Sequence, residues 1–438
     1  MQTNTTQEEF SKQASRMAQE LAEQVWEEVV ETDEGITQVD TWMRNKGSRF
    51  LRKMLGAALT HRAERMRVEG RCSCGGAVVF RQRRPFQLHT VLSGRDVDVR
   101  VQYGQCTDCG KGQTPLLNEM KLDREGFTQA LQELSLLAGV IEPYQSASGE
   151  LLRQFAGVVV SSEKIQSLVR QEGPKASDFM LKATDEPSEP FHQAAKAPLY
   201  VEIDGGMIHV DGRWQEVKLA CVFRGEDRVG EPGERGELTQ RRVIAIRGKP
   251  DQLAEQLWPL AVSMGADHRT VVVLADGAPW IWNVAEMFSH RVEILDWYHA
   301  DEHISHLARV LYGEATAEAE QFRSAQLDRF ANDQVAEVIQ ALRFLRKRIR
   351  STTKREEIVK LIGYLDKNRH RMMYKTFKQL GYHIGSGAVE SAIGHVVQQR
   401  MKRSGMRWHA VGADAMLALR SVYRSHGMWK GFSQYRAA

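Results

Sequence analysis

Two apolar runs in the second half of the chain end in the same way, and this repeated ending limits the folds that the chain can adopt. VEIDGG places Asp204 after one apolar run and before two glycines, and VVVLADGAPW places Asp276 after another and before Gly277. Short apolar runs that alternate with helical segments predict a mainly buried sheet in an α/β domain. Side chains at strand ends escape the core of such a sheet and can meet at one edge. The neighbouring glycines leave room for a metal ion, a phosphate or a nucleic-acid backbone.

A third acid, Glu390, lies near the start of a helix that follows Gly385–Ser386–Gly387. Phosphodiester transfer builds negative charge on oxygen, and two Mg²⁺ ions about 4 Å apart can activate the nucleophile and stabilise the leaving oxygen. Mg²⁺ prefers oxygen ligands and keeps several waters, so a few carboxylates suffice. Three nearby carboxylates without a metal would repel one another and take up protons. The alternative for any single Asp-Gly pair is an ordinary turn.

Four of the five cysteines form two close pairs at the ends of a short β-like segment: Cys72 and Cys74, and Cys106 and Cys109. Four thiolates satisfy tetrahedral Zn²⁺, and the intervening strands provide the arms of a zinc-ribbon-like module. The remaining cysteine, Cys221, stands in an apolar run and is expected to be a small buried hydrophobe. Arg81, Arg83 and Arg84 follow the first pair, so we expect this module to contact DNA.

The segments on either side of this module have different characters. We expect an N-terminal helical region at 1–69, the zinc-ribbon-like module at 70–118, a helix-turn-helix region at 119–173 and a linker at 174–198. In the third region Gly157 marks a turn, and Ser161 and Ser162 cap a second helix that could lie in the major groove. A simple helical hairpin is the alternative.

The second half divides into an α/β core at 199–299, a helical insertion at 300–380 and a last part of the core at 381–438. Charge is uneven: residues 1–40 hold ten acids against two bases, whereas residues 343–436 hold twenty-one Lys/Arg against five Asp/Glu. The basic end suggests a polyanion partner, DNA or RNA, with a solvated helical surface as the alternative. Without a long apolar run or a secretory signal, we expect a cytoplasmic protein with no membrane span.

Several segments together resemble a known family. They are VEIDGG, LADGAPWIW, ILDWYHADEH, GSGAVES and RMKRSGMRW. Residues 199–430, which contain them, resemble the catalytic region of bacterial insertion-sequence transposases of the DDE type, specifically the ISKra group, which is related to Mutator-like transposases. The cysteine pairs and the helix-turn-helix pattern also resemble the N-terminal half of that group.

The resemblance implies an α/β multidomain protein with an RNase H-like catalytic core, interrupted by a helical insertion and preceded by helical, zinc-ribbon and helix-turn-helix modules. It implies that Asp204, Asp276 and Glu390 are a catalytic triad that binds two Mg²⁺ (or Mn²⁺) ions. Glu390 follows Asp276 by 114 positions, which accommodates the insertion. The group also carries a Cys-or-Asp, two residues, then His pattern, and Asp296 to His299 fits it. We expect His299 to support the active site; zinc binding with His303, or packing, are the alternatives.

The expected activity is metal-dependent DNA cleavage and strand transfer on the element's terminal inverted repeats and target DNA. In RMKRSGMRW, Arg400, Lys402, Arg403 and Arg407 would contact phosphates, and Trp408 would offer a stacking face. Because two element ends must be brought together, we expect a homodimer or larger assembly, associated with the nucleoid. The alternatives are an inactive transposase-derived DNA-binding regulator and another RNase H-like metal nuclease.

Overall fold

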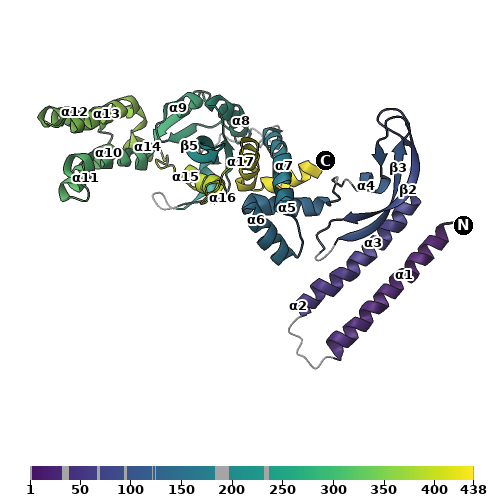
Figure 1. The fold of residues 1–438 in the computed structure, drawn as a ribbon. Coiled ribbons are helices and arrows are strands. Elements are labelled where there is room, and N and C mark those ends of the chain that lie inside the picture. Colours follow the sequence, from purple (N-terminus) through teal and green to yellow (C-terminus); the bar gives the residue numbers. More distant parts are fainter. Residues whose placement is uncertain are drawn as a thin grey trace. The chain divides into compact units, whose positions relative to one another are not determined.

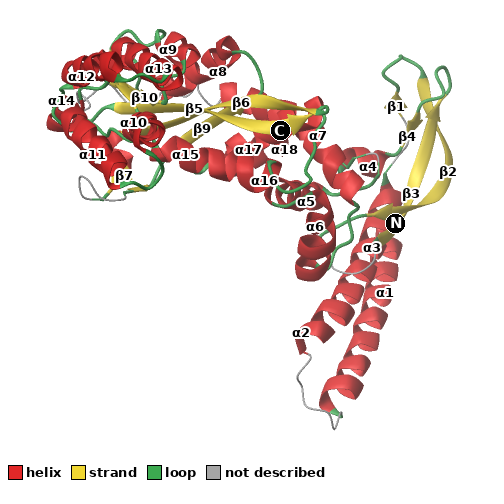
Figure 2. Ribbon diagram, turned by 60° about the vertical axis from the view of Figure 1, so that its left-hand side comes forward, coloured by secondary structure: helices red, strands yellow, loops and turns green. Residues whose placement is uncertain are grey.

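The chain folds into two compact units. The computed structural model describes residues 2–31, 39–66, 70–92, 96–120, 122–123, 125–182, 197–230 and 236–437. The units comprise residues 1–169 and 170–436, and the boundary lies inside helix α7 (Ser162–Lys182). Both units combine helices with β-sheet (Figures 1 and 2), which confirms the expected mixed α/β class.

The first unit contains an antiparallel sheet and two groups of helices. The strands pair in the order β1 (Gly70–Arg71), β2 (Ala77–Leu88), β3 (Val97–Cys106) and β4 (Gly112–Gln113). The preceding helices are α1 (Gln2–Val25), η1 (Trp26–Val30), α2 (Val39–Trp42), η2 (Met43–Gly47) and α3 (Ser48–Arg65). The following helices are α4 (Pro115–Glu119), α5 (Gln129–Ile141), α6 (Tyr144–Ser146) and η3 (Ala147–Ala156), before α7.

Buried and exposed residues alternate along the first half of β3, and this alternation decides which face of the sheet packs against a helix. Val97, Val99 and Val101 are buried, whereas the residues between them face outward. Successive side chains of a strand point to opposite faces, so one face of β3 is available to helix α3. Ala63 of α3 joins the same hydrophobic cluster as these valines.

A helix, a glycine turn and a second helix follow. Gly157 ends η3 with φ of 68°, in the left-handed region that glycine adopts without strain. The Ser161 hydroxyl accepts a hydrogen bond from the Lys164 amide at 3.1 Å and so caps the start of α7. Leu152 and Ile165, one from each helix, are buried in one cluster. Entry of the second helix into a DNA groove stays a prediction.

Part of the segment expected to be a linker is helical. Helix α7 continues through Pro174 to Lys182, and the rest of the expected linker, 183–196, lies outside the described residues. The proline interrupts one backbone hydrogen bond, but packing outweighs that loss: Ala176 is fully buried, and Gly173 lies directly against Ala415 of α17 (Ala410–Arg424). The sequence of the segment therefore predicted a helix end too early.

The second unit is built on a mixed sheet with the order β11-β10-β5-β6-β9. Its strands are β5 (Leu199–Val210), β6 (Arg213–Arg224), β9 (Arg242–Ile246), β10 (Val271–Ala275) and β11 (Arg291–Leu295). The β5–β6 hairpin turns at Asp211–Gly212, both with positive φ, as the Asp-Gly pair predicts. β5, β10 and β11 run parallel, whereas β5, β6 and β9 run antiparallel. A short ladder joins β7 (Arg228–Val229) to β8 (Glu237–Leu238), after η4 (Gly225–Asp227).

Helices cover the sheet and extend beyond it (Figure 2). α8 (Pro250–Ser263) and α9 (Pro279–Ala285) lie on one side, and α15 (Gly387–Ile393), η6 (Gly394–Gln398), α16 (Gln399–Met401) and α17 on the other; α18 (Met428–Ala437) ends the chain. The helices between β11 and α15 are α10 (Trp297–Tyr312), α11 (Ala317–Ala331), α12 (Val335–Arg348), α13 (Thr352–Asn368), η5 (Arg369–Arg371) and α14 (Tyr374–Gln379). We call α10 to α14 the helical insertion.

The close approach of α7 and α17 gives a testable expectation. A Cβ added at Gly173 would lie 2.3 Å from the Cα of Ala415, so Gly173→Ala forces two helices apart. We expect it to lower the free energy of unfolding by about 1–3 kcal/mol, measured by chemical denaturation. The matched control is Gly363→Ala in α13, where nothing lies within 4 Å of the added carbon. That variant should be neutral or slightly stabilising, and equal losses in both variants would contradict the packing argument.

Candidate active site and metal centre

Three aspartates follow neighbouring parallel strands. The parallel ladders joining β5, β10 and β11 end one residue before Asp204, Asp276 and Asp296. Because parallel strands in register end at the same edge of a sheet, the three carboxyl groups lie at one edge. Asp276 is held by its own turn, where its Oδ1 accepts a hydrogen bond from the Ala278 amide at 2.9 Å.

Asp204 differs from its expected place in one respect. It does not end its strand, because β5 continues through both glycines to Val210, paired with β6 throughout. What ends at Ile203 is the ladder to β10. Just beyond that point no strand of the described residues pairs with this edge of β5, and the Asp204 side chain is half-buried rather than enclosed.

Glu390 reaches the same edge from the other side of the insertion. It lies on α15, which packs against β5 near Gly206. A Cβ added at Gly206 would lie 3.6 Å from the side chain of Ile393, so the two elements approach closely there. A cavity of about 430 Å³ opens there, and both Asp204 and Glu390 line it. Two acids that lie 186 positions apart in the sequence therefore line one cavity.

The acids perturb one another. Burial raises the pKa of Asp204 to about 6, and the charges of Asp276 and Glu390 add to the effect, against the hydrogen bond from the Gly205 amide. Burial also raises the pKa of Glu390, and the Asp296 carboxylate reinforces it. Carboxyl groups that repel in a partly dry site lose that repulsion when cations bind between them.

These residues fit divalent cations of the Mg²⁺ type. Asp204, Asp276 and Glu390 offer only oxygen ligands, which such cations prefer. Among the described residues, the cysteine cluster is the group of His, Cys, Asp or Glu whose ligand atoms lie within 4.8 Å of one another, and these three acids do not form such a group.

Two buried acids hold Glu390 in place: Glu202, which the sequence did not single out, and Asp296, which the sequence offered only as the first residue of the pattern that ends at His299. The Glu202 carboxyl, 2% exposed in β5, accepts a hydrogen bond from the Val389 amide at 2.8 Å. Asp296, equally buried, accepts one from the Ser386 amide at 2.7 Å through its other oxygen while it caps α10. Together they fix the first turn of α15. The signal in the sequence was a glutamate inside the apolar run VEID.

His299 lies close enough to Asp204 to act on its electrostatics, and its role at the acids stays a prediction. It is half-buried in the first turn of α10, and its charge lowers the pKa of Asp204 against the effect of burial. His303, one turn later, stacks on Tyr364 with ring centroids 4.1 Å apart, and burial lowers its pKa to about 4. His303 is therefore engaged in packing, which the sequence analysis kept as an alternative to zinc binding.

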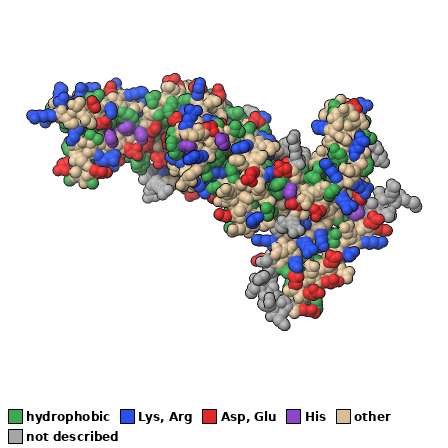
Figure 3. Space-filling view, in the orientation of Figure 1, with side chains coloured by type: hydrophobic (Ala, Val, Ile, Leu, Met, Phe, Trp, Pro, Cys, Tyr) green, Lys and Arg blue, Asp and Glu red, His purple; other side chains and the backbone are tan. Residues whose placement is uncertain are grey.

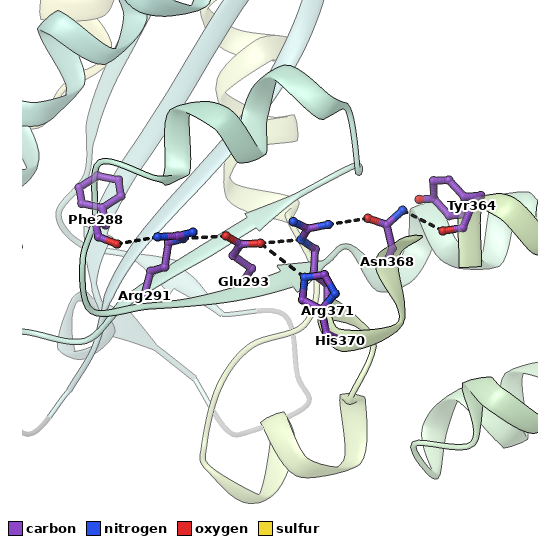
Figure 4. Close-up of polar contacts among 7 residues, drawn as sticks. All are labelled: Phe288, Arg291, Glu293, Tyr364, Asn368, His370 and Arg371. Atoms are coloured by element: carbon purple, nitrogen blue, oxygen red, sulfur yellow. Dashed lines mark hydrogen bonds and ion pairs between the residues drawn. The ribbon is translucent and has the colours of Figure 1, made fainter. Parts of the chain in front are cut away.

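A polar network ties the helical insertion to the sheet beside Asp276 (Figure 4). Glu293 of β11 binds Arg291 and Arg371, each at 2.6 Å, and Arg371 continues to Asn368 at 3.0 Å. The chain of contacts then reaches Tyr364 through the amide of Asn368, which donates to the Tyr364 carbonyl at 3.0 Å.

The phenol of Tyr364 completes this connection. Its hydroxyl donates to the carbonyl oxygen of Asp276 at 3.1 Å. Gly277 makes this approach possible, because a Cβ there would lie 3.0 Å from that hydroxyl, and its φ of 95° is one that glycine adopts readily. Helix α13 therefore helps to hold in place the turn that carries Asp276.

Comparison with known proteins places this architecture in one family. The family model described as Uncharacterised protein family (UPF0236) matches residues 36–436. The chain belongs to UPF0236. No curated protein matches this UPF0236 member. Among its described residues, no helix is long and apolar enough to cross a membrane.

A second candidate site in this UPF0236 chain is the cysteine cluster of the first unit. The Sγ atoms of Cys72 and Cys109 lie 3.6 Å apart, those of Cys74 and Cys106 3.5 Å apart, and all four lie within 4.8 Å of one another. The β1–β2 and β3–β4 turns bring them together. The cluster could bind a metal such as zinc. A hydrogen bond from the Cys74 amide lowers the pKa of Cys72 to about 6, whereas the neighbouring thiols raise the pKa of Cys74 to about 12, so the cluster favours a thiolate at Cys72 and a thiol at Cys74.

The residues expected to contact DNA differ in exposure. Lys402, Arg403 and Arg407 are exposed. Arg400 and Trp408, by contrast, are 1% and 8% exposed, with the guanidinium 5.2 Å from the indole ring. The expected phosphate contact of Arg400 and stacking face of Trp408 were wrong, because both side chains pack inside the second unit.

The arginines of the zinc-ribbon-like module also differ. Arg81 is exposed, Arg83 pairs with Glu64 at 2.9 Å, and Arg84 lies over the ring of Tyr103 at 4.4 Å. Arg83 therefore joins the module to helix α3, and Arg84 packs within the module.

Glu202 gives the second unit a pH-dependent stability. Burial raises the pKa of Glu202 to about 8, above its ordinary value, and the Asp296 and Glu390 charges add to this. The contribution of Glu202 to the free energy of unfolding is therefore complete below its pKa in the unfolded chain and is lost as pH rises through 8. The free energy of unfolding of the wild-type protein should fall between pH 5.5 and 8.5. We expect this fall to be smaller in Glu202→Gln by on the order of 1–4 kcal/mol.

The measurement is urea denaturation followed by tryptophan fluorescence at several pH values. Glu255→Gln, at an exposed position on α8, is the matched control and should keep the wild-type slope. A slope unchanged in Glu202→Gln would show that Glu202 is ionised in the folded protein across this range.

The cysteine cluster predicts a metal content. We expect about one zinc ion per chain in protein purified without chelator, and close to none in Cys106→Ser, by elemental analysis. Cys221→Ala should keep the ion, because Cys221 is buried in β6, away from the cluster. Removal of the ion should lower the thermal stability of the first unit, since metal binding contributes to folding. Retention of stoichiometric zinc by Cys106→Ser would contradict the assignment.

Proposed function

We propose that this protein is a DNA transposase that cuts DNA at element ends and joins them to target DNA through Asp204, Asp276 and Glu390. One observation carries the proposal. The parallel ladder between β5 and β10 ends one residue before Asp204 and Asp276, and Asp204 and Glu390 line the same cavity. The charges of the other two acids act on Asp204. A cluster of carboxyl groups of this kind is suited to metal-dependent phosphodiester chemistry.

The arrangement around these acids supports an RNase H-like core. The resemblance implies such a core with a helical insertion before the last acid, and α10 to α14 lie between β11 and the helix of Glu390. The mixed sheet carries the first two acids on its central strands. The insertion also reaches back to the turn of Asp276 through Tyr364.

In this proposal Asp204, Asp276 and Glu390 would hold two Mg²⁺ ions, whose chemistry would be to activate an attacking oxygen and to stabilise a leaving one. Glu202 and Asp296 keep Glu390 at the cavity by binding the amides of its helix. His299 adds a group beside Asp204 that can hold a proton or orient a water. The half-buried setting strengthens each of these electrostatic interactions by limiting the access of bulk water.

Basic surfaces support DNA as the substrate. Arg346, Lys347 and Arg348 form the last turn of α12 and are exposed. Figure 3 shows Lys and Arg side chains gathered at the end of the insertion that α12 forms. Phosphate groups are the natural partners of such a surface, and their binding would weaken steeply with salt. The exposed Lys402 extends positive charge to the acid cavity itself.

The decisive experiment uses DNA that carries the sequences flanking the gene, with Mg²⁺, and compares the wild-type protein with Asp276→Asn. We expect the variant to bind this DNA but to lose cleavage and joining by on the order of 10²–10³-fold, because one cation ligand and its charge are removed. Asp366→Asn, at an exposed position in the insertion, controls for the loss of a carboxylate elsewhere.

Each outcome separates the proposal from its rivals. Equal activity of wild type and Asp276→Asn would exclude Asp276 from the reaction. Binding without metal-dependent joining in the wild type would indicate a DNA-binding regulator. Cleavage without joining, on DNA that lacks inverted repeats, would indicate another metal nuclease.

A further inference from the structure

An exposed tryptophan stands at the start of β6, outside the acid cavity. Trp214 is 57% exposed, and it pairs across the hairpin with His209, whose ring meets it edge-on at 5.6 Å. A single exposed aromatic residue is common on protein surfaces and indicates nothing alone. Here, however, the indole lines a cavity of about 340 Å³ together with His209 and the loop 401–407.

That cavity has a fixed wall. The loop 401–407 is closed by Trp408, whose indole nitrogen donates to the Met401 carbonyl at 3.0 Å. Trp408 also forms backbone hydrogen bonds to His209 and Asp211 of the hairpin at 3.0 and 2.9 Å. Trp408, which was expected to stack a base, is thus buried and holds the wall of the cavity in place. Trp214 supplies the exposed aromatic ring. A preformed site loses less entropy when a ligand binds.

The charge of the cavity is positive. Lys402, Arg403 and Arg407 contribute to its lining, and no Asp or Glu does so among the described residues. The Lys402 ammonium lies 5.6 Å from the centroid of the Trp214 ring. An aromatic face beside cations is the combination that binds single-stranded nucleic acid, because the ring stacks a base while the cations contact phosphates.

The cavity also adjoins the acids. Lys402 lines both this cavity and the one that Asp204 and Glu390 face. His209 follows Asp204 by five residues on β5, which corresponds to about 17 Å along the strand. A DNA strand whose phosphate lay at the acids would therefore place a nucleotide further along within reach of Trp214.

We propose that Trp214, Lys402 and the loop 401–407 form a subsite for an unpaired nucleobase and its phosphate, next to the acid cavity. This inference rests on the proposed function, because it takes DNA to be the substrate. It adds that the strand beside the reacting phosphate is unpaired when bound, since a base must leave the duplex stack before the indole can cover its face.

The test measures binding rather than cutting. Full-length protein carrying Asp276→Asn is titrated, with fluorescence anisotropy as readout, into a labelled single-stranded oligonucleotide and into a blunt duplex of the same sequence. Adding Trp214→Ala should weaken single-strand binding by about tenfold and change duplex binding less than twofold, because base stacking contributes only where bases are unpaired. Trp214→Phe should restore most of the affinity, which guards against a misfolded variant.

Trp258→Ala is the matched control, because Trp258 is 44% exposed on α8 and does not line the cavity. It should leave both affinities unchanged. Unchanged single-strand binding by Trp214→Ala, or an equal loss on single strand and duplex, would overturn the subsite and leave the proposed function standing. If the starting protein binds neither DNA, the proposed function fails and the subsite fails with it.

Discussion

Repulsion among carboxyl groups at one edge of the sheet is the constraint on which the rest of the second unit depends. Asp204, Asp276, Asp296 and Glu390 gather there, with Glu202 buried directly beneath. Unpaired carboxylates in such a place would oppose folding. The protein meets this cost with backbone amides of α10 and α15, which donate to the two most buried acids. These hydrogen bonds offset the cost of burying the acids, and they also hold the helix of Glu390 in place.

The helical insertion contributes to this edge as well as extending from it. Glu293, Arg371 and Asn368 join the end of α13 to β11, and Tyr364 carries the contact to the backbone of Asp276. Gly277 is required there because a side chain would meet the phenol. A movement of the insertion would therefore shift the turn of Asp276 directly. In the proposed function, this contact couples the acids to the basic surface of the insertion that binds DNA.

The local features of the fold could be read from the sequence, and the reason is geometric. Alternation in VDVRVQY fixes which side of β3 is buried, the Asp-Gly pair fixes the β5–β6 turn, and the spacing of the cysteines lets two turns bring four sulfurs together. The first part of the expected linker, 174–182, is helical instead, and there helix α7 packs against α17, which is far away in the sequence. Short-range patterns cannot report a partner 242 positions away, which is the separation between Gly173 and Ala415.

The sequence by itself determined which residues could do chemistry: two aspartates after apolar strands, a glutamate after a glycine-rich turn, and paired cysteines. Only the tertiary structure decided which side chains meet and which reach solvent. It buried Arg400 and Trp408, which share a basic segment with exposed Lys402, and left Trp214 open. The physical reason is that exposure and desolvation depend on neighbours brought from other parts of the chain, whereas residue type and period are properties of the segment alone.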